Sequence, residues 1–221
     1  HNLGEVVEGT LHLLDNPQAS IDELMRYIKA PDFPTGALLY GKSGIREAYH
    51  TGRGSVRIRS RIEIEKRKGD LESIVVREIP YALNKSTLVE KIAMLVNERK
   101  IEGISDLRDE SDMKGIRIVM DLKKGVFSDV VINQLFKYTS LETSFGINMM
   151  AVVSNRPQLL NLKQVLEHFL DYRREVVIRR SRFDLKKAQH RAHILEGLRI
   201  ALDFIDEVVS LIRASRTPQE A

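Results

Sequence analysis

The most informative segment of this chain runs from Gly52 to Glu65 and reads Gly-Arg-Gly-Ser-Val-Arg-Ile-Arg-Ser-Arg-Ile-Glu-Ile-Glu. Apolar residues take alternate positions in it, at Val56, Ile58, Ile62 and Ile64. A period of two predicts one extended strand with one buried face. Arg57, Arg59 and Arg61 would then share the other face, about 6.6–6.8 Å apart. That spacing approximates the distance between successive phosphates on one nucleic-acid strand, and guanidinium suits phosphate. An ordinary solvated sheet face is the alternative interpretation.

Charge is concentrated around the same segment. Residues 42–61 contain one acidic side chain, Glu47, and are net +5, whereas the whole chain is +4. Such clustering is typical of a nucleic-acid footprint. Gly52 and Gly54 would let the backbone approach a ligand closely. The candidate DNA-binding residues are Lys42, Arg46, Arg53, Arg57, Arg59 and Arg61.

Length and composition narrow the class of protein. A chain of 221 residues with 43% hydrophobic content suits one large folded domain or two small ones. The absence of cysteine excludes a disulfide scaffold and thiol chemistry, and fits the reducing cytoplasm. No apolar run reaches 18 residues, so we expect no membrane partner. Both ends read as cut, which predicts a piece of a longer polypeptide.

The middle of the chain alternates regularly between strand and helix patterns. Expected elements are a strand at Ser73–Ile79, a helix at Thr87–Lys100, strands at Ile104–Arg108 and Ile116–Leu122, a helix at Ser128–Tyr138 and a strand at Ile147–Val153. Thr87 and Glu90 have capping-box spacing. The order β-α-β-β-α-β predicts an α+β fold, a two-layer sandwich of split-βαβ type. Short helices are expected before it, at residues 1–15, Ser20–Ile28 and Ile45–His50.

After Pro157 the pattern becomes that of one long helix, from Leu162 to about Ile212. Asn161 and Gln164 have N-terminal capping spacing. Apolar residues recur every seven positions at Leu162, Phe169, Val176 and Phe183. Such a helix is expected to project from the body and to need a partner along one stripe, as in a coiled-coil arm. Its basic run, Arg173–Lys187, is interpreted as a solvated face in preference to a DNA contact. The expected domains are 1–156 and 157–221.

Residues 36–43 match a phosphate-binding pattern. Gly36-Ala37-Leu38-Leu39-Tyr40-Gly41-Lys42-Ser43 fits the P-loop formula G-x-x-x-x-G-K-[ST]. A P-loop needs a buried strand before it and a sound helix after it. Here Pro31 and Pro34 precede the motif, and Gly52 and Gly54 end the following helix within two turns. We therefore expect no nucleotide binding.

Two groups of side chains have metal-ligand character. His190, His193 and Glu196 share one helix face, and a solvated face is the plainer interpretation. The acidic turn Asp106, Asp109, Glu110 and Asp112 could hold a divalent cation, although an acidic hairpin turn also explains it. Neither group forms a catalytic constellation, so we expect no catalytic residue and no metal ligand in this chain.

Several longer motifs carry a family resemblance over essentially all 221 residues. They are His1-Asn2-Leu3, Pro31–Gly36, Gly44–Gly54, Glu78-Ile79-Pro80-Tyr81, Asp106–Asp112, Leu135–Thr139, Tyr172–Glu175 and His193–Leu198. With them the chain resembles the A subunits of bacterial DNA gyrase, which are type IIA topoisomerases. The A subunit of topoisomerase IV is the close relative, and Gly146–Ala151 looks more like gyrase.

The resemblance implies a role within a larger enzyme. It implies a DNA-contacting tower (shoulder) domain followed by the outgoing helix of a coiled-coil arm. In the family the A subunit cuts duplex DNA through a tyrosine, whereas the B subunit handles ATP and magnesium. That tyrosine lies upstream of His-Asn-Leu, so this chain should lack it and Arg26-Tyr27 is not its counterpart. The implied partners are duplex DNA, a second A subunit and the gyrase B subunit. A purely structural coiled-coil module is the alternative from another class.

Overall fold

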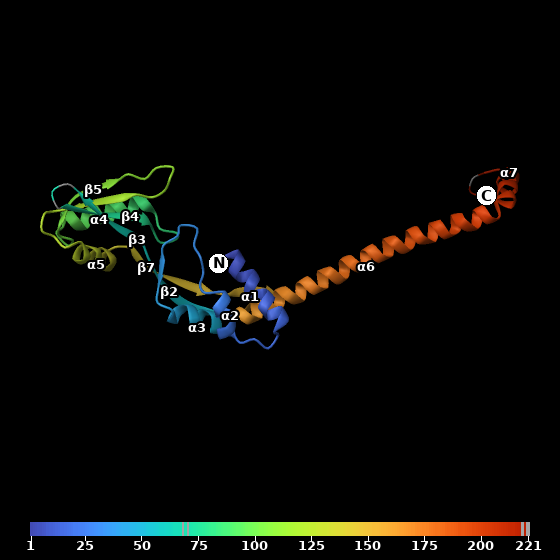
Figure 1. Cartoon of the computed structure of the whole chain (residues 1–221), viewed down its shortest axis with the longest axis horizontal. Helices are drawn as coiled ribbons and strands as arrows, with labels where there is room; N and C mark the ends of the chain where they lie inside the picture. The colour runs from blue at the N-terminus through green and yellow to red at the C-terminus, as the bar shows by residue number, and fades with distance from the viewer. Residues whose placement is uncertain (68, 70, 218, 220–221) are drawn as a thin grey trace. The chain divides into compact units, whose positions relative to one another are not determined.

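The computed structural model describes residues 1–67, 69, 71–217 and 219 (Figure 1). The chain divides into two compact units, His1–Glu167 and His168–Ala221. The first unit holds all the described strands in two sheets and a hairpin, together with helices α1 to α5. The second unit consists of the greater part of α6 and all of α7. The division falls inside the long helix α6.

Three short helices open the first unit. Helix α1 (Leu3–Asp15) starts at Asn2, whose side chain accepts from the backbone N–H of Glu5. Helix α2 (Ile21–Tyr27) starts with a complete capping box between Ser20 and Glu23. Helix α3 (Ser43–Thr51) ends at Gly52, which adopts the left-handed conformation with φ 80°.

Sheet A comprises β1 (Leu38–Tyr40), β2 (Arg53–Arg59) and β7 (Glu142–Asn148), in the order β1-β2-β7. Strands β2 and β7 pair antiparallel over seven residues, from Arg53 opposite Asn148 to Arg59 opposite Glu142. This pairing joins parts of the chain more than eighty residues apart, so it defines the sheet by a long-range contact.

The prediction of one strand across Gly52–Glu65 was wrong. Strand β2 ends at Arg59, and β3 (Arg61–Arg67) belongs to a different sheet. The residue between them, Ser60, is buried, and its N–H donates to the carbonyl of Leu141 at 2.8 Å. Because the chain passes from one sheet to the other at this residue, Arg61 does not share a sheet face with Arg57 and Arg59.

Sheet B contains β3, β4 (Leu71–Glu78), β6 (Ile118–Leu122) and β5 (Ile104–Asp109) in that order, all antiparallel. Strand β6 lies between β4 and β5, which α4 (Lys85–Asn97) connects, so this part is the expected split βαβ unit. The α+β class is confirmed. The last expected strand, Ile147–Val153, was wrong: β7 ends at Asn148 and pairs with β2, and β8 (Met150–Val153) forms a hairpin with β9 (Arg156–Leu159).

Helices α4 and α5 (Ser128–Tyr138) pack with sheet B around the main core. Its buried members are Ile74, Val76, Ile79, Leu88, Ile92, Leu95, Ile101, Ile104, Ile118, Met120, Leu122, Val131, Leu135 and Leu141. Helix α4 starts at Asn84, which accepts from the N–H of Thr87. The expected capping box at Thr87 and Glu90 was therefore wrong by three residues.

The other face of sheet B carries a lattice of ion pairs around one buried carboxylate. Asp121 is 3% exposed and accepts hydrogen bonds of 2.7 Å from Ser73 and from Arg108. Burial opposes its charge, but the bonds from Arg108 and Ser73 outweigh that cost and lower the pKa of Asp121. Arg117 bonds both oxygens of Glu65, at 2.6 and 2.8 Å, and thereby lowers the Glu65 pKa.

The long helix is confirmed, with one difference. Helix α6 spans Leu162–Asp203, and α7 (Ile205–Ala214) follows after an interruption at Phe204. The capping pair forms as predicted, because Asn161 and Gln164 each accept from the backbone N–H of the other, at 2.8 and 2.9 Å. Phe169 and Phe183 of the seven-residue repeat are 51% and 68% exposed. The stripe is buried at Leu162, but at Phe169 and Phe183 it is uncovered within the described part of this chain.

The close crossing of α3 over β2 yields a first prediction. A Cβ on Gly44 would overlap the carbonyl oxygen of Ser55, and backbone atoms cannot move aside. Gly44→Ala should therefore lower the free energy of unfolding by about 3 kcal/mol, as overpacking does. Gly146→Ala, on β7 of the sheet that α3 covers, is the control, because its Cβ would meet no atom within 4 Å. If urea denaturation found both variants equally stable, the close contact between α3 and β2 at Gly44 would be contradicted.

The ion-pair lattice yields a pH prediction. The pKa values of Asp121 and Glu65 are lowered in the fold, so their contribution to stability is present above their unfolded pKa values of about 4 and is lost as pH falls below them. Asp121→Asn should destabilise by roughly 1–3 kcal/mol at pH 7, and by progressively less as pH falls below 4. Asp171→Asn, at an exposed pair, is the control. If Asp121→Asn destabilised the protein by the same amount down to pH 2, the stabilisation would not come from the ionised Asp121 carboxylate.

Candidate nucleic-acid interface

Sheet A has one covered face and one open face. A Cβ on Gly54 would meet Gly44 and Ala48 of α3, so this helix covers the side of β2 to which Gly54 points. Val56 and Ile58 point to the same side, because side chains alternate along a strand, and they are 3% and 1% exposed. On the opposite side a Cβ on Gly146 would meet nothing within 4 Å. The second side is therefore open to a partner.

The open face of sheet A is defined by alternation along the strands and by their pairing register. Its residues are mostly cationic, aromatic or small, with one aliphatic and one acidic side chain: Leu38 and Tyr40 of β1, Arg53, Ser55, Arg57 and Arg59 of β2, and Glu142, Ser144, Gly146 and Asn148 of β7. Three arginines face one carboxylate, so the face is net positive. This composition suits a phosphate backbone better than it suits an apolar or cationic ligand.

At one end of this face two arginines share an acid and an aromatic ring. Arg57 lies 3.5 Å from Glu142, and Arg59 donates to the other oxygen of the same carboxylate. The guanidinium carbons of Arg57 and Arg59 lie 4.8 and 3.8 Å from the ring centroid of Tyr40. Phe136 contacts Arg59 as well, at 4.9 Å. Stacking and ion pairing together hold both guanidinium groups in place.

The other four sequence-predicted residues divide into two groups. Arg46 on α3 donates to Asp22 of α2 at 3.1 Å, and Arg61 on β3 lies 3.4 Å from Glu78. Arg46 and Arg61 thus have carboxylate partners within the chain, away from the open face. Arg53 lies on the open face. Lys42 is the residue before α3, and both Arg53 and Lys42 are exposed and make no ion pair within the described part of the chain.

The glycines beside Arg53 serve internal packing. A Cβ on Gly52 would meet the carbonyl oxygen of Leu160, and one on Gly54 would meet α3. The expectation that Gly52 and Gly54 admit a ligand was therefore wrong. They admit neighbouring parts of the same chain instead.

The P-loop match does not form a phosphate cradle. Strand β1 lies within the motif instead of before it. The N–H of Ala37, which would face a phosphate, donates to the carboxylate of Glu78 at 2.5 Å. That carboxylate occupies the position of an anion and would repel another one.

Within the described residues, no group of three or more His, Asp or Glu side chains is arranged to hold a metal ion. In the acidic turn Asp109 pairs with Lys85 at 2.7 Å, and Glu110 binds Arg108 and Arg117. His190, His193 and Glu196 are exposed along α6. Tyr27, the residue that mimics the family's tyrosine, packs on α1 and bonds His12 at 3.3 Å.

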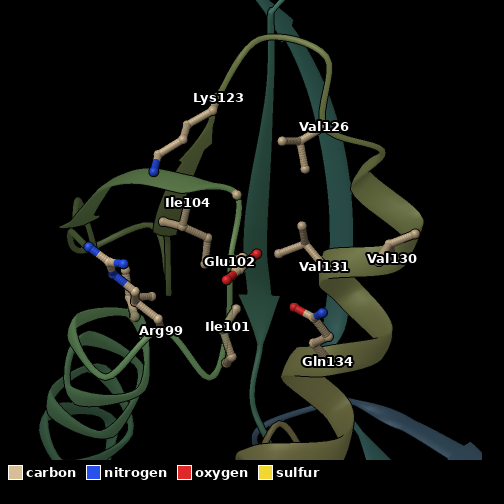
Figure 2. Close-up of a pocket in the computed structure, with 11 residues that line it drawn as sticks. Arg99, Ile101, Glu102, Ile104, Lys123, Val126, Val130, Val131 and Gln134 are labelled. Carbon is tan, nitrogen blue, oxygen red and sulfur yellow. The ribbon is translucent and has the colours of Figure 1, made fainter.

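A pocket of about 600 Å³ lies elsewhere, beside the end of sheet B. Figure 2 shows Val131 and Gln134 of α5 facing Ile101 and Glu102 across it. Arg99, Lys123 and Glu102 line it with charges of both signs, and its apolar lining, apart from the exposed Val130, belongs to the core. It contains no pairing of nucleophile and base, so we assign no chemistry to it.

Sequence reasoning missed Tyr40 and Glu142 as members of the open face. Tyr40 lies inside the misleading P-loop match, where only the strand-like run Ala37–Tyr40 indicated its place. Glu142 follows helix α5 and carries no local signal, because its place depends on the pairing of β7 with β2.

No helix among the described residues is long and apolar enough to cross a membrane.

Residues 1–221 match the family model for the DNA gyrase/topoisomerase IV A subunit. The chain is 62% identical over 221 residues to the DNA gyrase A subunit of Lawsonia intracellularis and 58% identical to that of Clostridium acetobutylicum. Each match covers all of this chain and 27% of the relative. Since the whole chain matches the family model, it belongs to the family of DNA gyrase/topoisomerase IV A subunits.

Proposed function

We propose that this chain is a DNA-contacting tower segment, followed by the first helix of a coiled-coil arm, of a DNA gyrase A subunit. The observation that carries the proposal is the open face of sheet A, with arginines at alternate positions of β2. Successive same-face residues lie about 6.6–6.8 Å apart, close to the phosphate repeat. The contacts are to backbone phosphate, which positions DNA without reading its sequence.

Within the complete enzyme, the chain cradles a duplex that other parts cut and reseal. The full assembly introduces negative supercoils with ATP in the cytoplasm. ATP and magnesium are bound by the B subunit, and the nucleophilic tyrosine lies outside these 221 residues. A second A subunit meets the first beyond the arm, whose exposed seven-residue stripe at Phe169 and Phe183 supports pairing with another helix.

Two alternatives remain distinct from this proposal. One is the same role in topoisomerase IV, against which the relatives named gyrase and the segment Gly146–Ala151 both count. The other is a purely structural module, in which Arg57 and Arg59 serve only to hold Glu142. The salt dependence of DNA binding separates this module from a DNA-binding segment.

Replacing Arg57 and Arg59 together by Gln should weaken DNA binding and flatten its salt dependence. Each phosphate contact contributes about 0.9 to the slope of log affinity against log salt concentration, so two lost contacts should reduce it by about 2. Folding should persist, because Val56 and Ile58 on the covered face are untouched. The affinity is measured across a salt series for this chain and for a full-length gyrase A subunit that carries it.

The matched control is the double variant of Arg46 and Arg61 to Gln, which removes the same charge away from the open face. It should leave the slope nearly unchanged. Equal slopes for the wild type and both double variants, all folded by circular dichroism, would reject the DNA-binding role and favour the structural module.

A further prediction concerns catalysis. This chain, mixed with gyrase B subunit, ATP and magnesium, should neither cleave nor relax supercoiled plasmid, because the family resemblance implies that the nucleophilic tyrosine lies upstream of His1. Full-length A subunit with the same B subunit is the positive control. A covalent adduct between DNA and any tyrosine of this chain, trapped by denaturation and identified by mass spectrometry, would disprove the assignment.

A further inference from the structure

Glu142 is the one acidic residue on the described open face of sheet A. It lies on β7 directly opposite Arg59, and its side chain is only 19% exposed. Its two carboxylate oxygens take different arginines, Oε1 towards Arg57 and Oε2 towards Arg59. A phosphate that binds either guanidinium must therefore compete with a carboxylate already in place.

We propose that Glu142 is a built-in competitor of DNA phosphate, which limits the affinity of this face and lets the duplex leave. The inference rests on the proposed function and specifies how that function is regulated. A carboxylate and a phosphodiester offer guanidinium the same kind of paired oxygen acceptors. DNA binding at Arg57 and Arg59 is then an exchange of one anion for another, and only the difference between the two anions contributes to affinity.

The aromatic support makes this exchange possible without rebuilding the site. Tyr40 lies under both guanidinium groups, and Phe136 also contacts that of Arg59. These contacts do not involve the carboxylate, so they persist when Glu142 is displaced. The arginine side chains are 55% and 29% exposed, which leaves part of each group accessible to an incoming phosphate.

The contrast with sheet B supports a specific role for a single acid. There Arg108 contacts Asp106, Glu110 and Asp121, and Arg117 contacts Glu65 and Glu110, so each arginine is bound by two or more carboxylates. On sheet A two arginines share one carboxylate. Arg108 and Arg117 are saturated, whereas the sheet A pair retains the capacity to bind another anion.

The test is Glu142→Gln, which keeps the size and removes the charge. DNA affinity at low salt should rise about threefold to tenfold, the scale of losing two partly exposed ion pairs that oppose binding. The slope of log affinity against log salt should steepen by up to about 0.9, because the face gains one unit of positive charge. Dissociation should slow by a similar factor. Glu142→Asp, which retains the charge, should stay within about twofold of the wild type.

Glu98→Gln is the matched control. It removes the same charge from an exposed ion pair with Lys100 that follows α4 and lies outside sheet A. Glu142→Thr, β-branched and suited to a strand, is a second neutral variant in case glutamine disturbs folding. Thermal unfolding checks that Glu142→Gln and Glu142→Thr are folded. The measurements use this chain and a full-length gyrase A subunit that carries it.

The outcomes separate this inference from the function on which it rests. If neutral variants bind no more tightly than Glu98→Gln while the Arg57 and Arg59 double variant binds weakly, Glu142 is no competitor and the DNA-binding role stands. Weaker binding by folded neutral variants would show that Glu142 orients the arginines, and would also overturn the inference. If neither the neutral nor the arginine variants change affinity, the proposed function itself fails.

Discussion

The antiparallel pairing of β2 with β7 is the constraint on which the candidate site depends. Seven residue pairs, from Arg53 opposite Asn148 to Arg59 opposite Glu142, bring together segments that are remote in sequence. The bond from Ser60 to Leu141 continues the contact where both segments leave sheet A. Without this pairing, β7 would not extend the sheet that α3 covers, and Glu142 would not meet Arg57 and Arg59. The charge and shape of the open face therefore follow from a backbone register.

The two sheets use arginine in opposite ways, although both are rich in it. On sheet B the guanidinium groups of Arg108 and Arg117 are each bound by two or more carboxylates, and hydrogen bonds to those acids raise the pKa values of both arginines. Such a lattice stabilises the sheet and presents no net positive field. Sheet A places three arginines against one acid and supports two of them on Tyr40. Available positive charge, more than the number of arginines, is what distinguishes a phosphate-binding face.

Local patterns predicted much of the fold and part of the site. The helix at Ser128–Tyr138, the start of α6 at Leu162 and the split βαβ unit follow from periodicity and capping residues. The break at Ser60 could not be predicted, because a buried serine continues the period-two pattern as well as an apolar residue would. The sequence pattern therefore groups Arg61 with Arg57 and Arg59, although the structure separates them. The acid at Glu142 and the partner of Arg46 are long-range contacts, which a single sequence does not encode in its local spacing.

The central claim is that DNA phosphate lies along the open face of sheet A. Nuclear magnetic resonance of the arginine Nε–Hε groups tests it most directly, with each signal assigned by single substitution and a short duplex titrated at low salt. The account predicts that the signals of Arg53, Arg57 and Arg59 shift together in a saturable way, while those of Arg108 and Arg117 stay in place. Shifts confined to the sheet B arginines, or to the basic run on α6, would contradict it.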